Sequence, residues 1–125
     1  MSAIQLGRVQ LLIMQILWSK GRATAREITD AIAATEAIAH STVQTLLRGL
    51  EEKGSVAHEV EDRTFVFYPL VKEENYKRNA TRDLLDRVFA GDVGSLVSHL
   101  LNDEKLSRRE LNEIRRLIDG QGNKR

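Results

Sequence analysis

The sequence has no cysteine, little proline and few aromatic residues. Its 125 residues include no Cys, one Pro and 5% aromatic side chains. Without cysteine, the protein can form no disulfide, no zinc–thiolate site and no cysteine nucleophile. No uncharged apolar run reaches the roughly 18 residues that a transmembrane helix requires. The N-terminus also lacks the basic start, apolar run and cleavage site of a signal peptide, so we expect a cytoplasmic protein.

The net charge is also small, at +1. Residues 1–70 carry seven Lys and Arg against eight Asp and Glu, which gives −1, and residues 71–125 carry twelve against ten, which gives +2. This balance argues against a protein that coats DNA through diffuse positive charge. If DNA is the partner, the positive charge must be concentrated on one face, and dimerisation must double it.

The most informative stretch is an amphipathic segment near the middle of the first half. It predicts a helix from about Ser41 to Lys53, which Gly54 ends. Its apolar residues recur at i, i+3, i+4 and i+7, which is one helical stripe: Val43, Leu46, Leu47 and Leu50. The opposite face is short and polar, with one long cation: Ser41, Gln44, Thr45 and Arg48. That face suits a DNA major groove, but an ordinary solvated helix has the same pattern, so the surrounding elements decide.

The order of the surrounding elements predicts a winged helix. A first helix carries the apolar residues Val9, Leu12, Ile13, Ile16, Leu17 and Trp18, and Gly21 ends it. Thr24 and Glu27 form a capping box for a second helix over 25–34, and 35–39 is a turn. After the third helix, two strands over 55–60 and 64–68 flank a hairpin tip, Glu61-Asp62-Arg63, and Pro69 ends the second strand. Three helices and a hairpin give a mainly α fold with a small β wing (α+β).

The remainder of the chain is predicted to be helical and to mediate dimerisation. A long helix from Lys72 is broken at Gly91, a second follows, and Ser107 with Glu110 caps a third. We divide the chain into a winged-helix DNA-binding domain (1–70), a helical dimerisation domain (71–120) and a disordered tail (121–125). The alternative is that the helices fold back on the winged helix as one core. The expected dimer residues are Leu84, Val88, Phe89, Leu96, Val97, Leu100, Leu101, Leu111, Ile114 and Leu117.

The candidate site residues are polar groups that can contact DNA. On the third helix, Ser41, Thr42, Gln44 and Thr45 can donate to phosphates or read base edges, and Arg48 can pair with guanine or with the backbone. Either Ser41 or Thr42 could instead be only a helix cap.

Catalytic and metal chemistry are not expected. The histidines His40, His58 and His99 are far apart in sequence, so no shared metal site and no cofactor are predicted. Of the three, His40 is interpreted as a groove-rim or capping residue. No nucleophile–base pair, phosphate-binding glycine loop or paired carboxylates suggest an enzyme.

Several motifs together resemble the penicillinase-repressor family of bacterial regulators, which includes methicillin-resistance regulators and copper-transport repressors. They are Ser41-Thr42-Val43-Gln44-Thr45-Leu46-Leu47, Glu52-Lys53-Gly54, Arg63-Thr64-Phe65-Val66-Phe67-Tyr68-Pro69-Leu70 and Leu96-Val97. The resemblance implies a dimeric winged-helix repressor, with Thr42, Gln44, Thr45 and Arg48 at the DNA face and Arg63 on the wing. The absence of cysteine excludes the copper-sensing branch. In the antibiotic-responsive branch a sensor protease cuts the second C-terminal helix, and the matching position here is His99-Leu100.

These observations predict a homodimeric repressor of transcription. The third helix of each subunit would enter a major groove of a palindromic operator, and the wing would touch the flanking backbone. The alternative is a winged-helix module that binds a protein partner without sequence-specific DNA binding, which the −1 charge of residues 1–70 favours slightly.

Overall fold

The computed structural model describes residues 6–122, and it divides the chain into two compact units. The first unit ends at Arg82 and the second begins at Asp83, so the division falls inside helix α4 (Glu73–Phe89). This point lies later in the chain than the boundary expected after residue 70. None of the helices between residues 6 and 122 is long and apolar enough to cross a membrane.

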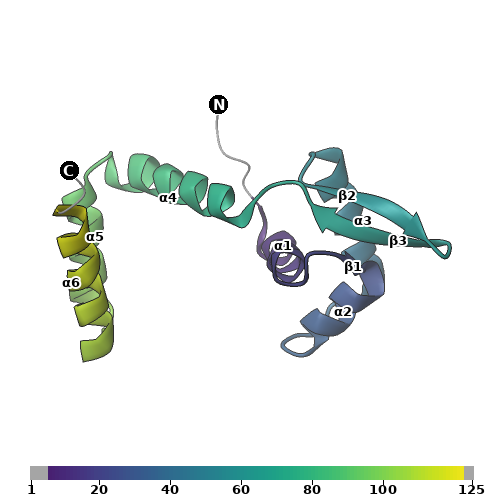
Figure 1. The fold of residues 1–125 in the computed structure, drawn as a ribbon, viewed down its shortest axis with the longest axis horizontal. Helices are drawn as coiled ribbons and strands as arrows, with labels where there is room; N and C mark the ends of the chain where they lie inside the picture. Colours follow the sequence, from purple (N-terminus) through teal and green to yellow (C-terminus); the bar gives the residue numbers. More distant parts are fainter. Residues whose placement is uncertain (1–5, 123–125) are drawn as a thin grey trace. The chain divides into compact units, whose positions relative to one another are not determined.

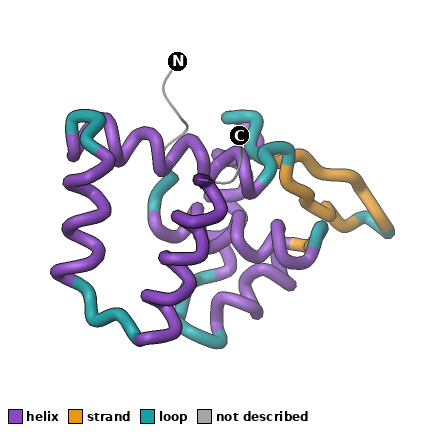
Figure 2. Tube along the Cα trace, turned by 60° about the vertical axis from the view of Figure 1, so that its left-hand side comes forward, coloured by secondary structure: helices purple, strands orange, loops and turns teal. Residues whose placement is uncertain are grey.

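The first unit is a winged helix, as the sequence predicts. Its elements, in chain order, are α1 (Arg8–Lys20), β1 (Ala23–Thr24), α2 (Ala25–Ala33), α3 (His40–Glu52), β2 (Val56–Glu61), β3 (Thr64–Pro69) and the beginning of α4. The sheet is antiparallel, with strand order β1-β3-β2. The hairpin of β2 and β3 projects beyond the helices of its own unit and forms the wing (Figures 1 and 2).

The predicted apolar stripe of α3 lies in the core of this unit. Val43, Leu47 and Leu50 are fully buried, and Leu46 is half-buried at the edge of the core. They pack with buried residues from the other elements of the unit: Ile13, Met14, Leu17, Ala23, Ile28, Ile32, Val56 and Phe67. Because one stripe of α3 is fixed in the core, its opposite face must point to solvent.

The capping box that the sequence predicts at the start of α2 is confirmed. The backbone N–H of Glu27 donates to Thr24 Oγ1 at 3.1 Å, and the backbone N–H of Thr24 donates to Glu27 Oε1 at 2.8 Å. The hydrogen bond from the Thr24 backbone lowers the pKa of the Glu27 carboxyl. Two donors that the first turn leaves unpaired are thereby satisfied, which fixes where α2 begins.

Replacing Thr24 with alanine is expected to lower the free energy of unfolding by about 1 kcal/mol, because it removes the cap acceptor. Urea denaturation followed by circular dichroism measures the change. Ser19→Ala is a suitable control, since Ser19 is exposed near the end of α1 and has no side-chain hydrogen bond within residues 6–122. Equal stabilities of Thr24→Ala and Ser19→Ala would contradict the capping role.

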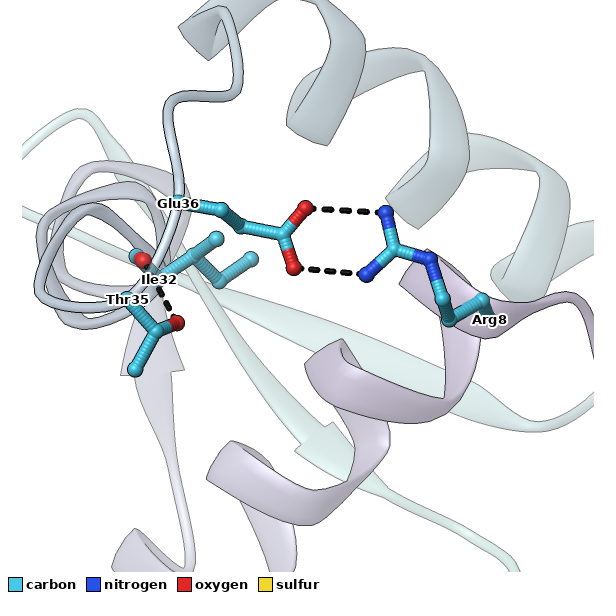
Figure 3. Close-up of polar contacts among 4 residues, drawn as sticks. All are labelled: Arg8, Ile32, Thr35 and Glu36. Carbon is cyan, nitrogen blue, oxygen red and sulfur yellow. Dashed lines mark hydrogen bonds and ion pairs between the residues drawn. The ribbon is translucent and has the colours of Figure 1, made fainter.

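A bidentate ion pair joins the beginning of α1 to the turn after α2. The guanidinium of Arg8 donates to both carboxylate oxygens of Glu36, at 2.6 and 2.8 Å (Figure 3). Thr35 beside it donates through Oγ1 to the Ile32 carbonyl. The hydrogen bond from Arg8 lowers the pKa of Glu36. The stabilisation is therefore present at neutral pH and is lost as the pH falls through the lowered pKa of this carboxyl.

Trp18 contacts the chain at the beginning of α4. Its indole Nε1 donates to the carbonyl of Val71 at 2.8 Å, and its ring centroid lies 5.7 Å from that of Tyr76. These contacts attach the first turn of α4 to the winged helix. The sequence pattern of α4 does not reveal them, because they join residues more than fifty positions apart.

The second unit contains the end of α4, then α5 (Val93–Asp103) and α6 (Arg108–Gly122). Gly91, with φ of +80°, follows the end of α4 as expected, and Ser107 and Glu110 form the predicted capping box of α6. The expectation of a disordered tail is wrong for residues 121–122, because α6 extends through Gly122. Glycine weakens a helix by about 1 kcal/mol but does not forbid it. Residues 123–125 lie outside the described part of the chain.

Candidate nucleic-acid interface

The outer face of α3 presents the polar residues that the sequence singled out. Ser41, Thr42, Gln44, Thr45 and Arg48 are all exposed. The helix begins at His40, with Ala39 at the N-cap position and no side-chain cap hydrogen bond. The alternative interpretation of Ser41 or Thr42 as a cap is therefore wrong: both lie inside the first turn. Their hydroxyl groups are left available for a partner.

His40 connects the two helices of the helix-turn-helix. Its Nδ1 lies 2.9 Å from Thr29 Oγ1, and that hydroxyl donates to the Ala25 carbonyl at 2.8 Å. A hydroxyl has one hydrogen, so Nδ1 must carry a proton and donate to Oγ1. His40 thus anchors the N-terminus of α3 against α2, and it lines the hollow described below.

The wing ends in a two-residue turn rather than the three-residue tip that the sequence predicts. Glu61 still pairs with Thr64, so only Asp62 and Arg63 form the turn. Their φ angles are +50° and +68°, in the left-handed region that such hairpin turns require at both central positions. Arg63 is exposed at this tip and has no hydrogen bond or ion pair within residues 6–122.

Two acidic residues beside the wing are paired with basic partners. Arg22 forms an ion pair with Glu61, and His58 Nδ1 lies 2.6 Å from Glu51 Oε2. Arg22 and Glu61 are each about half exposed, so their pairing stabilises the fold little, but it partly offsets the negative charge beside Arg63. The acidic wing therefore repels an anionic partner less than the sequence suggests.

A hollow of about 410 Å³ lies between α3 and the wing and brings some of the predicted residues together. Gln44 and Arg48 from α3 and Arg63 from the wing line it, although Arg48 and Arg63 are fifteen positions apart in sequence. Ser41, Thr42 and Thr45 are not part of its lining and lie elsewhere on the exposed face of α3.

The hollow also contains a basic residue that the sequence analysis missed. Arg26, the second residue of α2, is exposed and lines the hollow with Arg48 and Arg63. None of these three guanidinium groups has an ion pair within the described residues. The available signal in the sequence was the position of Arg26 in the first turn of α2, because a helix N-terminus favours anions. Three guanidinium groups from α2, α3 and the wing therefore line one hollow.

The residues predicted for dimerisation lie in the second unit, where they form an apolar surface. Among residues 83–122, Leu85 is the only buried side chain. Six of the ten predicted residues are exposed: Leu84, Val88, Leu100, Leu101, Leu111 and Leu117. The other four are half-buried: Phe89, Leu96, Val97 and Ile114. Val93 and Ile118 are also exposed apolar residues and were missed, although Ile118 continues the stripe of α6. The single chain leaves this surface uncovered.

Comparison with known proteins shows relatives over nearly the full length. The penicillinase repressor of Bacillus licheniformis is 27% identical over 121 residues, which are 97% of this chain and 94% of that protein. The methicillin resistance regulatory protein MecI of Staphylococcus aureus (strain N315) is 29% identical over 107 residues, which are 86% of this chain and 87% of that protein.

A solved structure and a family model agree with these relatives. The solution structure of monomeric Bacillus licheniformis BlaI in complex with the blaP half-operator is similar, with a TM-score of 0.51 and 28% identity, over 60% of this chain and 92% of that one. The model of the family described as penicillinase repressor matches residues 6–120. Since this match spans almost the entire sequence, the chain belongs to the penicillinase repressor family.

Proposed function

We propose that the protein is a DNA-binding repressor of transcription that reads its operator with α3. The observation that supports this best is the shared hollow, where Gln44 and Arg48 of the polar helix face lie with Arg63 of the wing. Arg26 adds a third guanidinium group to the same surface. Three cations without acidic partners within the described residues match a polyanion.

The proposal assigns different roles to the two elements. Thr45 and Arg48, on the outer face of α3, read base edges in the major groove, and Ser41, Thr42 and Gln44 contact bases or phosphates. Arg63 at the wing tip contacts the flanking backbone or the minor groove. The related BlaI repressor was solved in complex with a half-operator, which supports operator binding by this chain.

We further propose that the second unit holds two copies of the chain together. At least eight large apolar side chains between residues 83 and 122 are exposed in a single chain, and such surfaces mark interaction sites. A two-fold dimer would present two copies of α3 to the two halves of a palindromic operator. On this proposal residues 83–122 set the spacing between half-sites.

Control by a sensor protease is the remaining part of the proposal. Cleavage at His99-Leu100 would separate the end of α5 and all of α6 from the winged helix, and with them five of the eight exposed apolar side chains. Both residues are exposed but lie inside α5, so cleavage requires that this helix unwind locally.

A mobility-shift assay tests the function directly. A duplex from the region upstream of the protein's own gene is the probe, with unlabelled probe and a scrambled duplex of equal length as competitors. We expect a complex that the unlabelled probe displaces at a concentration at least about 1,000-fold lower than the scrambled duplex. Equal displacement by both competitors would contradict a repressor and favour the protein-interaction module.

A further inference from the structure

His58 is the one side chain of β2 that contacts both the recognition helix and the opposite strand of the wing through its ring. Its Nδ1 lies 2.6 Å from Glu51 Oε2 on α3. The ring stacks on Phe65 of β3 with a centroid distance of 3.9 Å and an interplanar angle of 11°. It also lies 5.6 Å from the ring of Phe67 in a tilted arrangement. One imidazole on β2 therefore contacts both α3 and β3.

The position of His58 along the hairpin makes this link important. Val56, toward the base of the wing, and Phe67, directly opposite His58 on β3, are buried in the core of the unit. Beyond His58, the next cross-strand pair on the same face is Val60 and Phe65, which are 60% and 49% exposed. His58 thus lies where the hairpin leaves the core. Past this point the wing is tied to the rest of its unit by the pairing of Val66 with Thr24 of β1 and by the exposed ion pair of Arg22 and Glu61.

The chemistry of the contact makes its strength depend on the charge of the ring. A carboxylate only accepts hydrogen bonds, so His58 Nδ1 must carry the hydrogen in both charge states. With a neutral ring only the Glu51 acceptor is charged; protonation at Nε2 gives the donor a positive charge as well, so the contact becomes an ion pair and is stronger. Both side chains are about two-thirds shielded from water, so screening is incomplete. Histidine changes its charge between about pH 5 and pH 8.

Among the charged groups around His58, Glu51 is the one in direct contact with the ring. Glu51 faces it from α3, and β3 contributes Phe65 and Phe67, which do not titrate. Glu59 and Glu61 belong to the other face of β2, because side chains alternate along a strand. Further charged or titratable groups near the contact line the same hollow as Glu51: Arg26, His40, Arg48 and Arg63.

We propose that His58 is a positioning residue that holds the wing against α3 and so places Arg63 for contact with DNA. The inference rests on the proposed repressor function and extends it: operator affinity depends on the His58–Glu51 contact and increases as the ring becomes protonated. His58 itself touches no DNA in this proposal. It acts through the position of the wing tip.

The test compares His58→Phe, Arg63→Ala and the double variant with the unchanged protein at pH 6. Phenylalanine retains the stacking on Phe65 but cannot donate to Glu51. His99→Gln is the matched control, because His99 makes the same kind of contact, 2.9 Å from Asp103, on the exposed surface of α5. We expect His58→Phe to lower operator affinity about five- to tenfold and His99→Gln to leave it unchanged.

Two further results distinguish positioning from general support of the fold. Once the wing is released, Arg63 contributes less, so the double variant should lose clearly less affinity than the product of the two single losses. From pH 6 to pH 8 at constant salt, affinity of the unchanged protein and of His99→Gln should fall about threefold more than that of His58→Phe. The proposal would be overturned if the double variant lost as much affinity as the product of the two single losses. It would also be overturned if affinity fell equally with pH in His58→Phe and in the unchanged protein.

Hydrogen exchange of the free protein tests the contact without DNA. In His58→Phe the amides of residues 59–66 should exchange at least about fivefold faster than in His99→Gln, while those of α1 remain unchanged. Equal exchange would overturn the positioning role even if the protein bound no operator. Faster exchange in a protein that binds no operator would instead show that the proposed function is wrong and that only the wing contact is correct.

Discussion

A variant with both Leu100→Glu and Leu117→Glu is expected to be a monomer and to lose at least about 100-fold in affinity for a full palindromic operator. Leu100 on α5 and Leu117 on α6 are 50% and 60% exposed in the single chain, so the substitutions should leave the fold of each chain intact. In a dimer they would place unpaired carboxylates in an apolar interface, which is strongly unfavourable.

The size of the expected loss follows from the coupling of two half-sites. In a dimer, binding of one α3 makes binding of the second intramolecular, which raises overall affinity by about 10²–10⁴ without a new contact. The variant should therefore retain the affinity of the unchanged protein for a single half-operator. Sedimentation equilibrium at micromolar concentration measures the mass, and mobility shifts on full and half operators measure the binding.

A control adds the same charge at polar positions of the same helices. Ser98→Glu with Asn112→Glu also introduces two carboxylates on α5 and α6, at exposed residues outside the apolar set. This variant should remain a dimer with nearly unchanged operator affinity. If Leu100→Glu/Leu117→Glu also remains dimeric, the interface lies elsewhere. If it is monomeric but binds the full operator normally, dimerisation does not contribute to binding.

Thr45→Ala and Arg48→Ala are expected to reduce discrimination between operator and random DNA by about 1–3 kcal/mol each. Both residues are exposed on the outer face of α3, where side chains reach base edges. Arg63→Ala should weaken binding to both kinds of DNA by a similar factor and reduce the salt slope by about one unit, because a phosphate contact releases counterions.

The hollow adds a distinction between Thr45 and Arg48. Arg48 lines the hollow together with Arg63, whereas Thr45 does not. Arg48 is therefore the residue that can reach either a base edge or a phosphate. Gly49 follows Arg48 and has no side chain with which to contact the DNA backbone, so a phosphate contact at this position would fall to Arg48. Arg48→Lys separates the two roles, because lysine retains the charge but not the bidentate geometry of arginine.

Titration of each variant with operator and scrambled duplexes across a salt series gives the ratio of the two affinities and the salt slope of binding. Specificity that survives in Arg48→Lys and Arg48→Ala would make Arg48 a phosphate contact. Unchanged specificity in Thr45→Ala as well would mean that α3 does not read the sequence, and the protein-interaction alternative would gain support.

Features that depend on a few neighbouring residues were predictable from the sequence. The apolar stripe of α3, the capping boxes at Thr24 and Ser107 and the glycines after α3 and α4 all act within about one or two helical turns. Their outcome is therefore set by local hydrogen bonds and by the period of the hydrophobic pattern. The order of the helices and strands along the chain was then enough to predict the winged helix.

Other features depend on residues that are distant in the sequence, and only the tertiary structure decided them. Strand β1 has two residues and exists because Ala23 and Thr24 pair with Phe67 and Val66, which no local pattern specifies. The attachment of the first turn of α4 to the winged helix follows from the contacts of Trp18 with Val71 and Tyr76.

Which residues lie together in the candidate interface could also be decided only from the folded chain. The sequence determined which face of α3 is exposed, because its opposite stripe is apolar and must be buried. Arg26 and Arg63 join Arg48 only because α2, α3 and the wing enclose one hollow. Likewise, Glu51 and Glu61 count as free acids in the sequence, but folding brings His58 and Arg22 to them. Charges interact through space over a few ångströms, so their balance at a surface is decided by the fold and not by their order along the chain.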